Sequence, residues 1–146
     1  MTKIGIIGTG TISGIYLKSP TVFPILEMVA CADLELARAQ AKAEEYKIEA
    51  LSVADLLAHP EIEIVINLTI PAAHAEVAQA AIAHGKSVYS EKPLALNTTD
   101  GKAIIDAAIK LPCIDSFTTA LNPSGMRAGR VEKGKCAPHQ DAADRE

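Results

Sequence analysis

Three small residues near the start of the chain have the spacing of a phosphate-binding loop. Gly8 and Gly10 follow an apolar run, and Ser13 comes shortly after them. Gly8 lets the chain leave a strand through backbone angles that a Cβ would obstruct, and Gly10 lets a diphosphate approach the backbone. The helix that follows offers free N–H groups and its positive dipole end to an anion. The pattern G-x-G-x-x-S therefore predicts a dinucleotide site, with serine in place of the third glycine.

A carboxylate follows this loop at the separation typical of the residue that binds the ribose. Asp33 ends the second apolar run, about 20 residues after the glycines. Its oxygens can accept hydrogen bonds from both hydroxyls of an adenosine ribose, and its charge would repel a 2′-phosphate. Leu34 and Glu35 supply no cation to offset that repulsion, although Arg38 and Lys42 on the next helix could reach round. We therefore expect NAD rather than NADP.

The elements that must position these residues alternate between short apolar runs and helical stretches. Strands are expected over residues 4–7, 28–32, 48–51, 62–68 and 86–90. Helices are expected over residues 11–18 (interrupted by Pro20 and Pro24), 34–46, 53–58, 71–84 and 98–110. Expected helix ends are Ser52 and either Asn97 or Thr98 as N-caps, and Gly85 as a C-terminal stop. This order predicts an α/β fold, a Rossmann-type doubly wound parallel sheet.

In such a sheet, ligands bind beyond the carboxyl ends of the strands. The rule brings the glycine turn, Asp33, residues 68–74 and residues 91–93 to one edge. The simpler alternative is a tight turn followed by a solvated strand end. The regular succession of strand, turn, helix, strand and acid favours the nucleotide site.

Composition excludes several other classes of protein. Only 3% of the 146 residues are aromatic, there is no Trp and the net charge is −4, which argues against nucleic-acid binding. No apolar run reaches the roughly 20 residues of a membrane span. We expect no signal peptide, because the chain passes almost directly into a strand. The odd number of cysteines, without metal-ligand spacing, suggests reduced thiols and no metal site. We therefore expect a cytoplasmic protein.

The chain changes character near residue 110. Residues 111–146 contain three prolines and three glycines, and their large apolar residues follow neither structural period. We expect a short extended piece at residues 114–119 followed by a poorly ordered tail. The predicted organisation is a Rossmann domain over residues 1–110 and an irregular tail over residues 111–146. The abrupt change suggests a shift of reading frame or an early stop.

Two further motifs connect the sequence with a known family. Residues 67–74 read NLTIPAAH and residues 91–95 read EKPLA. With these motifs on a dinucleotide fold, residues 3–110 resemble the Gfo/Idh/MocA oxidoreductases, a family named after glucose–fructose oxidoreductase, inositol dehydrogenase and a rhizopine-catabolism protein. The resemblance implies an oxidoreductase that transfers hydride to or from a nicotinamide cofactor, with a sugar or polyol as substrate.

The resemblance also implies roles for individual residues. Residues 68–71 would line the ribose and nicotinamide side with His74 close by, and Glu91 would touch the nicotinamide ribose. Lys92 would be catalytic: it would bind or polarise the substrate oxygen, because a cation stabilises a developing alkoxide. Its peptide bond to Pro93 would be cis. Without the family, Lys92 reads as a solvated lysine and His74 as a polar residue at a helix start. The candidate cofactor-binding residues are Gly8, Thr9, Gly10, Thr11, Ile12, Asp33, Leu34, Leu68, Thr69, Ile70, Pro71, His74, Glu91 and Lys92.

The sequence also departs from the family. Members carry a second, sheet-containing domain that completes the substrate pocket, and residues 111–146 do not resemble it. We expect this chain to bind NAD weakly without turning over substrate, and its uncovered apolar surface to favour self-association. A sugar-like substrate is expected only where a second domain is present. The alternatives are a non-catalytic dinucleotide-binding module and a degenerate remnant without function.

Overall fold

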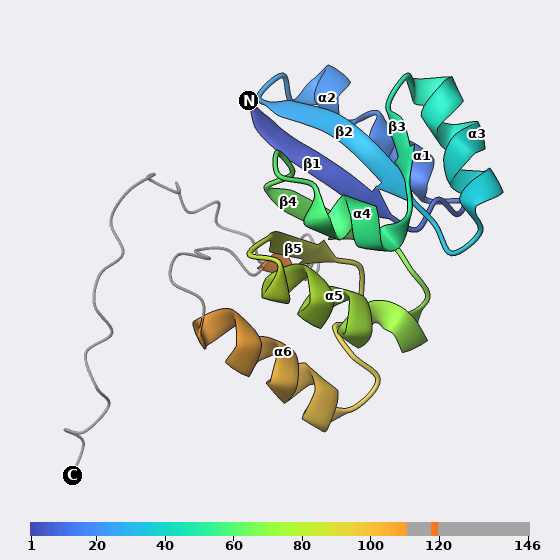
Figure 1. Cartoon of the computed structure of the whole chain (residues 1–146). Helices are drawn as coiled ribbons and strands as arrows, with labels where there is room; N and C mark the ends of the chain where they lie inside the picture. Colours follow the sequence, from blue (N-terminus) through green and yellow to red (C-terminus); the bar gives the residue numbers. More distant parts are fainter. Residues whose placement is uncertain (111–117, 120–146) are drawn as a thin grey trace, which may run out of the picture.

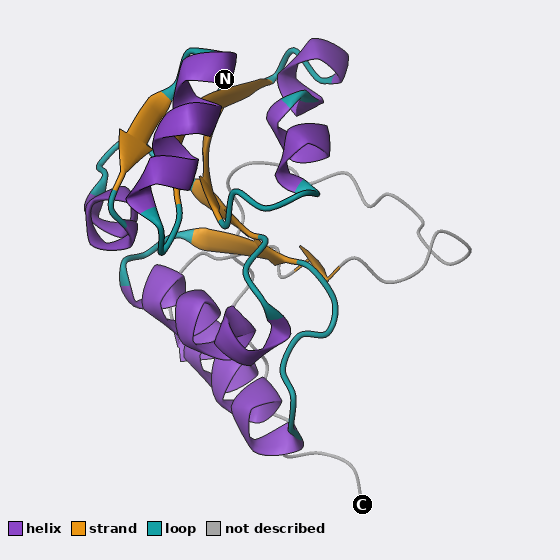
Figure 2. Ribbon diagram, turned by 90° about the vertical axis from the view of Figure 1, so that its right-hand side faces the viewer, coloured by secondary structure: helices purple, strands orange, loops and turns teal. Residues whose placement is uncertain are grey.

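The fold is a parallel sheet with helices on both faces (Figure 1; Figure 2). The computed structural model describes residues 1–110 and 118–119. The strands are β1 (Thr2–Ile7), β2 (Leu26–Ala32), β3 (Glu49–Leu51), β4 (Ile64–Asn67), β5 (Ser87–Ser90) and β6 (Thr118–Thr119). They lie in the order β3-β2-β1-β4-β5-β6, and each neighbouring pair is parallel. This order confirms the predicted doubly wound sheet and puts its switch point between β1 and β4.

The helices divide between the two faces of the sheet. They are α1 (Ser13–Leu17), α2 (Ser19–Val22), α3 (Leu36–Tyr46), α4 (Val53–Ala58), the 3₁₀ turn η1 (Pro71–Ala73), α5 (His74–Ala83) and α6 (Thr98–Lys110). One buried cluster joins α1 and α3 to the sheet, and the other joins α4, α5 and α6 to its opposite face. Helices α5 and α6 lie side by side in both views (Figure 1; Figure 2).

Strand alternation explains why the sheet has a core on each face. Ile4 and Ile6 of β1 belong to the cluster with α1 and α3, whereas Ile7 belongs to the opposite cluster. Neighbouring residues of a strand point to opposite faces, so a strand that is covered on both sides reads as a continuous apolar run. Cys31 of β2 is buried among these residues, and burial together with the charge of Asp33 raises the pKa of its thiol to about 11.

Local signals place the helix ends where the sequence predicts them. The Ser52 side chain accepts a hydrogen bond from the Asp55 amide at the start of α4. Asn97, rather than Thr98, caps α6, since its side chain accepts from the Asp100 amide at 2.9 Å. Gly85 follows α5 with a φ of +71°, the left-handed conformation that commonly ends a helix.

The structure corrects the prediction between β1 and β2. The expected helix over residues 11–18 is only five residues long in α1, and the separate helix α2 follows it. Pro20 lies in the first turn of α2. The fixed φ of proline suits the start of a helix, where its missing N–H removes no internal hydrogen bond. Pro20 therefore takes part in a second helix.

The expected extended piece at residues 114–119 is represented by β6, which pairs with β5. The other parts of the expected tail lie outside the described residues. In the part of the chain that the structure describes, no helix is long and apolar enough to cross a membrane.

Candidate functional site

The carboxyl ends of four adjacent strands bring the predicted residues together. Ile7 at the end of β1 is in register with Ala32 of β2 and with Asn67 of β4. Asn67 is in turn in register with Ser90 of β5. The loops that begin at residues 8, 33, 68 and 91 therefore start level with one another, at one edge of the sheet. This confirms the convergence expected from the topology.

Gly8 fixes the approach of the β1 loop to the β4 loop. Its φ is +102°, and a Cβ built on it would lie 2.6 Å from the backbone carbon and oxygen of Leu68. The Leu68 amide donates to the Ile7 carbonyl at 2.8 Å, and the Gly8 amide donates to the Ala32 carbonyl at 2.8 Å. No other residue fits here, because any side chain would meet backbone atoms in a conformation that L residues avoid.

Gly10 faces open space. A Cβ built on it would meet no atom within 4 Å, and residues 10–12 are exposed. The backbone N–H groups of Gly10, Thr11 and Ile12 donate to no acceptor within residues 1–110. Ser13, in the third small position, is buried and donates from its hydroxyl to the Gly10 carbonyl at 2.7 Å. The loop thus combines free donors with room beside them, which suits a diphosphate even though α1 is shorter than expected.

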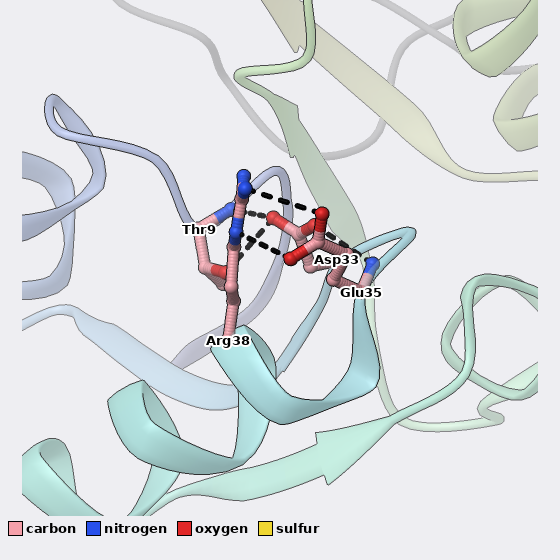
Figure 3. A network of polar contacts seen from close by, with 4 residues as sticks. All are labelled: Thr9, Asp33, Glu35 and Arg38. Carbon is pink, nitrogen blue, oxygen red and sulfur yellow. Dashed lines mark hydrogen bonds and ion pairs between the residues drawn. The ribbon is translucent and has the colours of Figure 1, made fainter.

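Asp33 joins the β2 loop to the glycine loop (Figure 3). Its Oδ2 accepts hydrogen bonds from the Thr9 amide at 2.7 Å and the Thr9 hydroxyl at 2.9 Å, and its Oδ1 accepts from the Glu35 amide at 3.0 Å. Burial opposes ionisation, but these donors and the charge of Arg38 outweigh it and hold the pKa of Asp33 below its ordinary value. Asp33 is therefore an ionised acceptor beside Gly10, with lone pairs left for further donors.

A buried polar network supports the β4 and β5 loops. Asn67, at the end of β4, donates from its side-chain nitrogen to the His74 carbonyl at 3.0 Å. Its side-chain oxygen accepts from the Thr69 hydroxyl at 2.6 Å and from the Thr69 amide at 3.3 Å. Asn67 and His74 are both almost completely buried. These bonds fix the turn over residues 68–71, which the family resemblance places on the nicotinamide side.

The His74 ring connects that turn with the loop that carries Lys92. Its Nδ1 lies 2.6 Å from the Pro93 carbonyl oxygen, and its Nε2 lies 2.9 Å from the Thr69 carbonyl oxygen. Carbonyl oxygens only accept, so a neutral imidazole satisfies one of them and a doubly protonated ring satisfies both. The structure therefore places His74 beneath the loops, where it holds backbone, rather than on the open edge.

Glu91 and Lys92 follow β5 at the same edge. The Tyr16 hydroxyl donates to the Glu91 carboxylate, and burial together with this hydrogen bond raises the pKa of Tyr16. Lys92 is exposed, and its ammonium meets no hydrogen-bond or salt-bridge partner among residues 1–110. The Lys92–Pro93 peptide is cis, as expected. Among the described residues, no group of His, Cys, Asp and Glu side chains could hold a metal ion.

Comparison with known proteins decides the family. A family profile described as "Oxidoreductase family, NAD-binding Rossmann fold", that of Gfo/Idh/MocA, matches residues 2–118. The chain belongs to the Gfo/Idh/MocA oxidoreductase family. The Rossmann fold is thus that of an NAD(P)-binding domain of this family.

Relatives of the chain include proteins named inositol 2-dehydrogenase. It is 39% identical over 113 residues to an inositol 2-dehydrogenase of Salmonella paratyphi B, a match that covers 74% of this chain and 33% of that protein. The chain spans about a third of the length of such curated relatives.

Solved structures show the same fold. A biliverdin reductase of Synechocystis sp. PCC 6803, in complex with biliverdin and NADP+, matches with a TM-score of 0.68 and 28% identity, over 74% of this chain and 34% of that one. A UDP-N-acetylglucosamine 3-dehydrogenase of Acidithiobacillus ferrooxidans matches with a TM-score of 0.68 and 29% identity, over 74% of this chain and 35% of that one.

Two residues of the site, Asn67 and Tyr16, have no role in the predictions made from the sequence. Asn67 carries a detectable signal, because a polar residue ending a strongly apolar strand is unusual unless its side chain is hydrogen-bonded. Tyr16 carries none, since its partner Glu91 is 75 positions away in the chain and only the fold brings the two together.

The two glycines of the loop allow a matched test. Gly8→Ala should lower the free energy of unfolding by at least about 2 kcal/mol, because it adds a backbone clash to an unfavourable φ. Gly10→Ala should leave stability within about 0.5 kcal/mol and weaken NADH binding, because its methyl group enters the open space beside the free amides. Urea unfolding and NADH titration of both variants measure this. Equal stability losses would contradict the assigned division of roles.

His74 should affect the binding of the nicotinamide half of the cofactor and not that of the ADP-ribose half. His74→Phe removes the N–H donation of the ring, which costs about 1–3 kcal/mol of stability for each carbonyl left without a partner. Affinity for NADH should fall, whereas affinity for ADP-ribose, which lacks the nicotinamide, should be unchanged. Isothermal titration with the two ligands measures the difference, and the exposed His84, the C-cap of α5, changed to Phe, is the control. Equal losses for both ligands would reduce His74 to a general structural role.

Proposed function

We propose that this chain is the cofactor-binding part of an NAD-dependent oxidoreductase of the sugar or polyol dehydrogenase type. The observation that carries the proposal is the open space and free amides at Gly10 directly beside the ionised Asp33. The nicotinamide ring, when bound, accepts or donates the hydride. The protein residues bind and orient the reactants around it.

Each loop would hold a different part of the dinucleotide. The amides of Gly10, Thr11 and Ile12 would bind the diphosphate, and Asp33 would accept hydrogen bonds from the adenosine ribose. Leu34 and Ile70 are 97% and 69% exposed, and large apolar side chains left so open at a site are suited to cover flat rings. Leu68, Thr69 and Pro71 would complete the nicotinamide side with Ile70.

Lys92 would act on the substrate. Its free ammonium stands next to Glu91 at the edge of the sheet, where it would bind the oxygen of the reacting carbon and stabilise negative charge on that oxygen as the hydride moves. Tyr16 would orient Glu91 toward the nicotinamide ribose through their hydrogen bond. Relatives named inositol 2-dehydrogenase support a polyol as substrate class.

We expect the 146-residue chain to bind NADH without measurable turnover. It spans about a third of the length of those relatives, and among residues 1–110 Lys92 is the only group that the resemblance assigns to the substrate. The same coverage favours the second candidate, a dinucleotide-binding module without catalytic activity. Absence of turnover from this chain is compatible with both candidates, so only a positive result separates them: turnover on a panel of polyols that Lys92→Met abolishes would establish the oxidoreductase.

We propose NAD rather than NADP because the loop that follows β2 is negatively charged. The carboxylates of Asp33 and Glu35 would repel a 2′-phosphate bound beside Asp33, and one guanidinium, that of Arg38, stands next to them. Asp33→Ala should weaken NADH binding about tenfold or more, since it removes hydrogen bonds to a charged acceptor, and should weaken NADPH binding less.

The dissociation constants of NADH and NADPH can be measured from the fluorescence of the cofactors themselves, without interference from tryptophan, because the chain contains none. Asp33→Asn, which keeps the shape and removes the charge, separates repulsion from lost contacts. Absence of saturable NADH binding to the unaltered chain would refute the proposed function, and equal weakening of both cofactors would remove Asp33 from the ribose site.

A further inference from the structure

The side chains beside Asp33 form an arrangement that the glycine motif alone does not indicate. Arg38 binds Glu35 by two contacts, from Nε to Oε2 at 2.9 Å and from its terminal nitrogen to Oε1 at 3.2 Å. Glu35 is the N-cap of α3 and Arg38 lies in its first turn, three positions further on. Figure 3 shows this pair next to the carboxylate of Asp33 and to Thr9.

The pair is located at the candidate ribose site. The Glu35 amide donates to Asp33 Oδ1 at 3.0 Å, and the charge of Arg38 acts on the Asp33 carboxylate. Lys42, the other cation considered on this helix, is bound to Glu45 at 2.7 Å and lies near the ring of Tyr46. Arg38 is therefore the cation available to a group placed beside Asp33.

The ion pair between Arg38 and Glu35 can also be broken easily in favour of another anionic partner of Arg38. The side chains of Arg38 and Glu35 are 59% and 63% exposed, and exposed ion pairs contribute little stability. A guanidinium binds a phosphate through the same two-point geometry that it uses for a carboxylate, and a dianionic phosphate is the stronger partner. What opposes the exchange is the charge of Glu35, which would remain next to the phosphate.

We propose that Glu35 is a specificity-determining residue, which favours NAD by occupying Arg38 and by adding a second negative charge beside Asp33. This inference rests on the proposed function. It follows that removing the charge of Glu35 alone releases Arg38 for a 2′-phosphate and gives the chain affinity for NADP, with Asp33 and the glycine loop unchanged.

The test is the ratio of the dissociation constants for NADPH and NADH, measured by fluorescence titration. Glu35→Gln should lower this ratio about fivefold, the effect of a single charge interaction near the surface, with little change for NADH. Arg38→Gln in the Glu35→Gln background should return the ratio to at least its original value. The exposed Glu44 of α3, changed to Gln, removes the same charge away from the pair and should leave the ratio unchanged.

The outcomes separate this inference from the proposed function. An unchanged ratio in Glu35→Gln, or the same change in Glu44→Gln, overturns the role of Glu35 while NADH binding stands. A lowered ratio that survives the removal of Arg38 overturns the exchange of partners. Failure of the unaltered chain to bind NADH overturns both. Added salt should reduce the change in this ratio caused by Glu35→Gln, because interactions between exposed charges are screened.

Discussion

The close contact between the Gly8 backbone and the backbone of residues 68 and 69 is the constraint on which the site depends. It occurs at the switch point, where the chain leaves β1 toward β2 on one side and where β4 pairs on the other. A Cβ at position 8 would separate the two loops, and with them the diphosphate and nicotinamide halves of the candidate site. The open space beside Gly10 can serve a ligand that also reaches the β4 loop only because Gly8 lets the two loops approach each other closely.

Buried polar groups extend this constraint across the sheet edge. Asn67 fixes the turn after β4, and His74 ties that turn to the loop after β5. Such groups are costly to bury unless each finds a partner, so their hydrogen bonds restrict the loops to one arrangement. Asp33 does the same between the loops after β1 and β2. The side chains of Lys92 and Leu34 are exposed at this edge.

The sequence allowed the fold and the location of the site to be predicted, because apolar runs, caps and glycines act locally. Ser52, Gly85 and the run ending at Asp33 all have the structural roles expected of them. The split of the first helix was missed because Pro20 starts a helix as readily as it ends one. The partners of Tyr16, His74 and Arg38 could not be predicted, since they depend on which loops become neighbours and on the rotamers chosen there.

The most direct test of the central claim, that one sheet edge binds a nicotinamide dinucleotide, is an NMR titration of the ¹⁵N-labelled chain with NADH. The account predicts saturable shifts in the amides of residues 10–12, 33–35, 69–70 and 91–92, which lie on four separate loops. Shifts should be absent at the opposite edge, around Lys3 and Lys86. No saturable change, or changes centred on that opposite edge, would contradict the account.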